Sequence, residues 1–283
     1  MIRMGAMSVV FAALAGLAAL AACGISVDTG YAASSATPAD GDAGGTEVPG
    51  TGPATTTDAS TDADGGTGTA QIDLSSLFTV DVIISHANGS YDTSQVPVDA
   101  SGYVLLTQSA EDTLFDAGHT GLPDNGFFPA NADHPDVLLG YRNTDFGNNA
   151  RRLAPPSDAV TIPLPQRRFN RLQIIGISTE GTTTHTATIR YLDGTESAET
   201  ITYDDWYTTT LGPRSYRLID GLDRASIGDA RAYPYPDLFN RNFAVSGVDL
   251  TPNTARAVRD VTITCTSTSS TSTRFHLLGV VGD

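Results

Sequence analysis

From about residue 71 to its end, the chain is a succession of short runs rich in Val, Ile, Leu, Thr and Tyr, separated by clusters of Gly, Pro, Asn and Asp. This pattern is typical of short strands joined by turns, and no stretch has the periodicity of an amphipathic helix of normal length. We therefore predict an all-β fold, a single antiparallel β-sandwich of the jelly-roll type over residues 71–283. Strands are expected near residues 78–85, 103–107, 137–141, 159–163, 170–178, 185–191, 200–206, 216–220, 243–250, 260–265 and 274–281.

One hairpin can be predicted in detail, because Asp193-Gly194 separates two strand-like runs. A two-residue turn would send the apolar residues of the two strands to opposite faces of the sheet. A three-residue loop of Leu192, Asp193 and Gly194, with Gly194 at positive φ, collects them on one face. We predict the longer loop, with these side chains facing the core: Ala187, Ile189, Tyr191, Ile201 and Tyr203.

The N-terminus has the organisation of an export signal. Arg3 is followed by an uncharged apolar run from Val9 to Ala22, which is shorter than the roughly 20 residues that a membrane-spanning helix needs. The run ends in Leu-Ala-Ala-Cys at residues 20–23, which resembles the lipobox of bacterial lipoproteins. The alternative is an ordinary signal peptide with a chance cysteine. The resemblance implies cleavage before Cys23 and attachment of diacylglycerol to its sulfur, so residues 1–22 would be removed.

Residues 23–70 are predicted to form the lipidated N-terminus and a disordered tether. Positions 24–70 are rich in Gly, Thr, Ala, Ser and Asp and contain few apolar side chains, so they cannot offset the entropy of ordering. We expect an exported protein that is anchored to the cell membrane or outer membrane by its lipid. Its folded domain would face the periplasm or the cell exterior.

The charge of the chain excludes several functions. There are 32 acidic residues against 16 basic ones, and every basic residue is Arg. Without Lys, the chain cannot perform Schiff-base chemistry or provide a phosphate-loop lysine. Residues 71–283 hold 25 acidic residues against 15 Arg, a net charge of about −10 that repels phosphate backbones, so we expect no nucleic-acid partner. Anionic lipid headgroups are repelled in the same way, and the bilayer contact is therefore assigned to the Cys23 lipid.

Cys265, the second cysteine, lies in a strand-like run in which Val261 and Ile263 share its face. We predict an inward-facing thiol that packs as a small apolar side chain, and we assign it no catalytic role.

Binding chemistry is expected in three long connections, at residues 108–136, 143–152 and 220–242, because long loops on a rigid sandwich commonly carry function. The first contains Gly-Leu-Pro-Asp-Asn-Gly-Phe-Phe at residues 121–128. With Asp205-Trp206 and the last strand at 274–281, this layout resembles the galactose-binding-like jelly rolls found beside bacterial carbohydrate-active enzymes. The resemblance implies a ligand site in loops at one end of the sandwich, often with a structural calcium nearby.

Individual residues support two interpretations each. Trp206, flanked by two polar residues, could stack on a sugar face or pack in the core. The tyrosines at 233 and 235 could form a lip of the site or cap the sandwich, and Arg151 could hold an acidic sugar or pair with surface carboxylates. The candidate ligand-binding residues are Asp124, Asn125, His134, Asn149, Arg151, Asp205, Trp206, Tyr207, Tyr233 and Tyr235.

The same first connection is the candidate calcium site. Asp133 and Asp136 provide hard oxygen ligands, although Asp residues in loops also serve turn formation. The five histidines show no zinc-ligand spacing, and no cofactor is required. The sequence thus predicts a non-catalytic module that binds polysaccharide or cell-wall glycan. The alternatives are a structural or adhesion lipoprotein that contacts other proteins and, third, a glycan-directed hydrolase.

Overall fold

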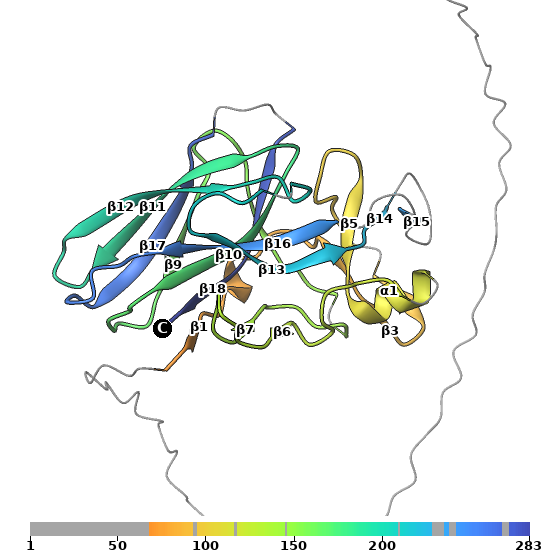
Figure 1. Ribbon diagram of the computed structural model, residues 1–283, viewed down its shortest axis with the longest axis horizontal. Coiled ribbons are helices and arrows are strands. Elements are labelled where there is room, and N and C mark those ends of the chain that lie inside the picture. Colours follow the sequence, from red (N-terminus) through yellow and green to blue (C-terminus); the bar gives the residue numbers. More distant parts are fainter. Residues whose placement is uncertain are drawn as a thin grey trace, which may run out of the picture. The chain divides into compact units, whose positions relative to one another are not determined.

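Two antiparallel sheets pack face to face in a β-sandwich (Figure 1). The computed structural model describes residues 68–92, 95–115, 118–144, 146–208, 210–227, 235–237, 242–267 and 272–283, so Cys23 and most of the predicted tether lie outside the described residues. The first sheet has the order β1-β18-β10-β16-β13, and β8 pairs with β18. Its strands are β1 (Ala70–Gln71), β8 (Arg151–Leu153), β10 (Leu172–Thr179), β13 (Ser215–Leu222), β16 (Phe243–Leu250) and β18 (Arg274–Gly282).

The second sheet has four strands in the order β12-β11-β17-β9. Along β11, buried and half-buried residues alternate, because one face packs on the first sheet and the other faces solvent. The alternation matches the Thr and Arg side chains that the sequence places at every second position. Its strands are β9 (Ala159–Pro163), β11 (Thr183–Tyr191), β12 (Glu196–Tyr203) and β17 (Val258–Cys265).

The first sheet is buried on both faces, and every residue of β10 is buried. Successive side chains of a strand point to opposite faces. Ile174 belongs to the core between the two sheets, whereas Ile175 belongs to a second core on the far side of the first sheet. A strand covered on both faces reads as a continuous apolar run, which is what Leu172–Thr179 shows at its centre.

The second core is covered by short elements and the segments that join them (Figure 1). A small sheet has the order β15-β14-β5-β2, in which β2 and β5 pair in parallel, unlike the pairs of the two large sheets. The short strands are β2 (Ile83–Ile84), β3 (His86–Ala87), β4 (Ser90–Tyr91), β5 (Tyr103–Leu106), β6 (Phe127–Phe128), β7 (Val137–Leu138), β14 (Ala225–Ser226) and β15 (Tyr235–Pro236); a 3-10 turn spans Ser75–Leu77.

The single α-helix of the described residues, α1 (Gln108–Leu114), opens the first of the three predicted long connections. Thr107 caps its N-terminus, because the hydroxyl accepts a hydrogen bond from the Ala110 N–H at 3.3 Å. The helix is drawn in yellow on the right of Figure 1, next to β3, and it also contacts β5. A third, small apolar cluster forms beneath it and includes Ala110 and Phe115. No helix of the described residues is long and apolar enough to cross a membrane.

The sequence predictions for the sandwich are largely confirmed. The fold is all-β, and the long strands coincide with predicted runs, whereas the expected strand at 78–85 is reduced to β2. His185 pairs with Ile201 and Ile189 with Ser197, so the β11–β12 hairpin has the predicted three-residue loop, with Gly194 at φ 81°. Cys265 is buried, as predicted. The jelly-roll topology stays a prediction.

Two buried titratable side chains have pKa values displaced in opposite directions. Burial and the neighbouring Asp92 carboxylate raise the pKa of Asp81 to about 8, although Asn149 Nδ2 donates a hydrogen bond to it at 2.5 Å. Burial lowers the pKa of His185 to about 4; its ring packs against that of Phe275, with centroids 4.4 Å apart. The folded state therefore holds a proton on Asp81 at neutral pH and none on His185.

We predict that the free energy of unfolding falls by up to about 2 kcal/mol between pH 6.5 and pH 8. In this range the unfolded chain has already released the Asp81 proton, so folding takes up a proton and becomes less favourable as the pH rises. His185 acts weakly in the opposite direction, because in the unfolded chain its pKa of about 6.5 leaves it half protonated at the lower end of this range and neutral above it. Asp81→Asn should abolish the fall in urea titrations across this range, whereas His185→Gln should leave it in place. An unchanged fall in Asp81→Asn would contradict the assignment.

Candidate functional site

Several strand connections meet at a concave surface region of about 360 Å³, which we call the Trp206 cavity. Its lining residues come from the turn before β5, the β10–β11 turn and the segment after β12. The segment after β13 and the first residue of β16 complete it. The side chains that line it are Asp99, Ser101, Glu180, Asp205, Trp206, Tyr207, Arg224 and Phe243. Three of the predicted ligand-binding residues, at positions 205–207, are thus brought together in one cavity.

The backbone of residues 205–207 is fixed on both sides. The Trp206 N–H donates to the Ser178 carbonyl at 2.8 Å, and the Trp206 carbonyl accepts from the Ala244 N–H at 3.0 Å. The Asp205 carboxylate accepts from the Gly181 N–H at 2.5 Å and from the Tyr207 N–H at 3.0 Å. These bonds tie the segment to the end of β10 and the start of β16, so its side chains are presented from an anchored backbone.

The two aromatic residues of this segment have different surroundings. Trp206 is only 5% exposed, and its ring packs 4.5 Å from that of Phe243, so the packing interpretation describes most of its surface. Tyr207 is 50% exposed and lies 5.5 Å from the same Phe243 ring. Of the two, Tyr207 therefore presents the aromatic face that a ligand can reach, and the Phe243 ring packs against both.

Arg224 lines the cavity and is held by two ion pairs and by aromatic rings. Its guanidinium pairs with Asp237 at 2.9 Å and with Asp99 at 3.4 Å. It also lies over the ring of Tyr103 at 3.5 Å and over that of Phe243 at 4.2 Å, which is cation–π geometry. A planar guanidinium clamped in this way is a fixed structural element.

The cavity has an excess of negative charge. The carboxylates of Asp99, Glu180 and Asp205 line it together with the single guanidinium of Arg224, which also pairs with Asp237. Burial raises the pKa of Asp99, while the Tyr103 N–H and the Arg224 guanidinium act in the opposite direction. Glu180 is exposed at the rim and accepts from the Ala100 N–H and the Ser101 hydroxyl, both at 3.3 Å. Such a surface attracts cations and hydroxyl donors and repels anions.

The predicted residues of the first long connection lie apart from the Trp206 cavity lining and stabilise local turns. Asp124 accepts from the Ser109 N–H at 2.9 Å and Asn125 from the Phe127 N–H at 3.0 Å. His134 is 2% exposed, and its two ring nitrogens contact the Pro135 carbonyl at 2.7 Å and the Asn131 amide at 2.9 Å.

The remaining predicted residues are distributed over the fold. Asn149 is buried, and its Oδ1 accepts from the Val82 N–H at 2.9 Å. Arg151 pairs with Asp158 at 3.3 Å near the surface, in line with the ion-pair interpretation. Tyr233 lies outside the described residues; the backbone of Tyr235 is in β15, where it pairs with Ser226.

The candidate calcium ligands Asp133 and Asp136 are exposed and engaged in the loop. Asp136 Oδ1 accepts from the Ala130 N–H at 2.7 Å, and the Asp133 N–H donates to Asn131 Oδ1 at 2.8 Å. These are the turn contacts that the sequence also allowed. The calcium site stays a prediction.

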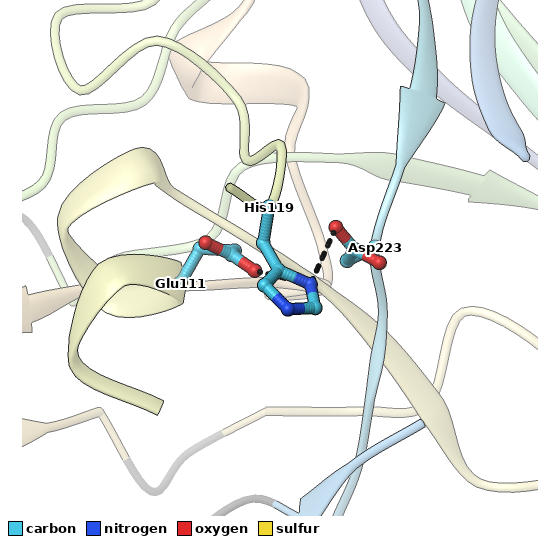
Figure 2. A group of neighbouring side chains, drawn as sticks. All are labelled: Glu111, His119 and Asp223. Carbon is cyan, nitrogen blue, oxygen red and sulfur yellow. Dashed lines mark ion pairs between the residues drawn. The ribbon is translucent and has the colours of Figure 1, made fainter. Parts of the chain in front are cut away.

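Sequence reasoning did not identify a cluster of metal-ligating side chains at α1. Glu111 of α1, His119 of the following loop and Asp223 after β13 place one donor atom each within 4.8 Å of one another (Figure 2). Glu111 and Asp223 are 112 positions apart, so no local spacing reveals them. Asp99 and Glu180 of the Trp206 cavity were missed for the same reason.

No protein-family model matches this chain, and no curated protein matches it. The function is therefore argued from the geometry of the chain itself.

We predict that Arg224→Met lowers the free energy of unfolding by about 3 kcal/mol or more, because it leaves the Asp99 and Asp237 carboxylates buried without their guanidinium. Arg151→Met is the matched control, since its ion pair with Asp158 is partly exposed and should cost under about 1 kcal/mol. Chemical denaturation of the wild type and the two variants measures both changes in the free energy of unfolding. Equal effects of the two substitutions would contradict the role assigned to Arg224.

Proposed function

We propose that this protein is an exported, lipid-anchored protein whose β-sandwich binds a carbohydrate of polysaccharide or cell-wall glycan in the Trp206 cavity, without catalysis. The observation that carries the proposal is the exposed Tyr207 ring beside fixed carboxylates. Sugar rings present apolar C–H faces that pack on aromatic rings, and their hydroxyl groups donate hydrogen bonds to carboxylates. The galactose-binding-like resemblance supports it, because it implies a site in loops at one end of the sandwich.

The charge of the cavity narrows the ligand to neutral or amino sugars. Its carboxylates outnumber its single guanidinium, and the guanidinium is already engaged by Asp99 and Asp237. A uronic acid or a phosphorylated sugar would place its negative charge next to Glu180 and Asp205 without a free cation to receive it. Rigid, pre-formed polar groups also favour binding, since little ordering of the protein is required.

A structural or adhesion role is the second candidate. Phe127 of β6 and Leu138 of β7 are cross-strand partners and are 39% and 41% exposed. Exposed apolar pairs of this kind contribute to protein–protein contacts. The other exposed large apolar side chains of the described residues are Phe146, Leu192 and Tyr207.

We predict that Tyr207→Ala weakens binding to a cognate glycan by about tenfold or more, the value of one aromatic stacking contact. The full chain would be screened on neutral, amino and acidic glycans, and the affinity measured by calorimetry. Phe146→Ala is the matched control, because Phe146 is 44% exposed and does not line the cavity. Equal affinities of both variants, with unchanged melting temperatures, would place the site elsewhere. Absence of binding across the panel would favour the protein-contact role, and release of sugar fragments would favour the hydrolase.

The anchor has a separate test. We predict that Cys23→Ser moves the protein from the membrane fraction to the soluble exported fraction, because the serine hydroxyl does not accept the lipid. Fractionation and immunoblotting of the wild type and the variant in a bacterial host measure this directly. A membrane-bound variant would disprove lipid anchoring at Cys23 while leaving the glycan site unaffected.

A further inference from the structure

We propose that Glu111, His119 and Asp223 form a binding site for one divalent transition-metal ion of the zinc class. The inference is independent of the glycan site, since none of these residues lines the Trp206 cavity. The three side chains come from α1, from the loop after it and from the residue that follows β13, and Figure 2 shows the imidazole between the two carboxylates.

The distances within the cluster fit donor atoms around a metal better than hydrogen bonds. His119 Nδ1 lies 3.5 Å from Glu111 Oε1 and 3.3 Å from Asp223 Oδ2. A charge-assisted N–H···O bond is shorter, about 2.7–2.9 Å. In a tetrahedral zinc site with bonds of about 2.0–2.1 Å, donor atoms are about 3.3–3.4 Å apart. The two measured separations lie at that spacing.

A hydrogen bond from the imidazole does not account for the approach of two carboxylates. Both carboxylates approach the same nitrogen, Nδ1, which carries at most one hydrogen and directs it along one line. A metal ion at the centre would use the Nδ1 lone pair and one oxygen from each carboxylate at the same time. The three donors then supply one nitrogen and two oxygens.

The charges of the three groups lead to the same conclusion. The side chains of Glu111, His119 and Asp223 are 1%, 7% and 2% exposed. A divalent cation at the centre would interact with both carboxylates in a place shielded from water, where such electrostatic attraction is strong.

Hydrogen bonds around the cluster fix its ligands. Asp223 Oδ2 accepts from the Thr120 N–H at 2.9 Å, and the Asp223 N–H donates to the Thr120 carbonyl at 2.9 Å. The Gln108 amide accepts from the Gly121 N–H at 2.9 Å and donates to the His119 carbonyl at 3.4 Å. Outer contacts of this kind orient metal ligands and strengthen binding.

The donor set selects the kind of metal. An imidazole nitrogen with two carboxylate oxygens suits zinc and related first-row ions. Calcium takes six to eight oxygen ligands, and magnesium prefers an octahedral oxygen shell with several waters. Three protein ligands leave a fourth position of a tetrahedral zinc site for water or for a further ligand.

The test is a calorimetric titration of the full chain, first stripped with a chelator, with zinc chloride and in parallel with calcium chloride. We expect one zinc ion per chain, a raised melting temperature, and affinity at least tenfold lower for calcium. Each of Glu111→Gln, His119→Gln and Asp223→Asn should weaken zinc binding at least tenfold. His86→Gln and Glu180→Gln are the controls and should bind zinc as the wild type does. No stoichiometric binding, or binding unchanged in the three variants, would overturn the site.

A second measurement needs no substitution and so does not depend on the variants folding. X-ray absorption at the zinc edge of the loaded wild-type chain should show nitrogen and oxygen donors at about 2.0–2.1 Å in fourfold coordination. A sixfold oxygen shell without the imidazole signature would overturn the assignment. Failure of this site would leave the Tyr207 result unchanged, and failure of glycan binding would leave the zinc titration unchanged, so the two proposals can be judged separately.

Discussion

The six-stranded sheet is buried on both faces, and the rest of the structure depends on that burial. One face is covered by the second sheet, whose outer surface is free to face solvent. The other face needs an apolar cover as well, because Ile175 and Ile177 point into it. No second sheet of comparable size supplies that cover among the described residues, so short strands and connections must do so, with side chains such as Leu105 and Phe128.

The short strands and connecting segments that cover this face bury backbone N–H and C=O groups that have no sheet neighbour. Each of these groups still needs a hydrogen-bond partner. Side chains fulfil this role in the described part of the chain. Asn149 accepts from the Val82 N–H and donates to Asp81, and Asp99 accepts from the N–H groups of Ser101 and Tyr103. Polar residues in this layer are therefore part of the framework, which explains why His134 and Asn149, plausible ligand residues from sequence, are enclosed and engaged.

Sequence reasoning succeeded where the determining contacts are local. The register of the β11–β12 hairpin follows from apolar alternation and from Gly194, and the inward thiol of Cys265 follows from its strand alone. Asp205, Trp206 and Tyr207, which sequence reasoning named as ligand residues, are consecutive and line the Trp206 cavity, and their binding role stays a prediction. Sequence reasoning could not find Arg224, Asp99 and Glu180 as their neighbours, because these come from three different connections. Helix α1 was not predicted, since seven residues give too little periodicity and its stability depends on the Thr107 cap and on the cluster beneath it.

Asp223 and Arg224 connect the two proposed sites, because they are consecutive residues between β13 and β14 with side chains that serve different partners. Asp223 contacts His119, whereas Arg224 pairs with Asp99 and Asp237 in the Trp206 cavity. Backbone bonds fix the same two residues: the Asp223 N–H donates to Thr120, and the Arg224 carbonyl accepts from Asp237. The contacts of Asp223 and those of Arg224 therefore fix the same short stretch of backbone from two sides. Two side chains that serve different partners thus anchor the connection between β13 and β14 to the covering layer, and neither set of contacts requires the other.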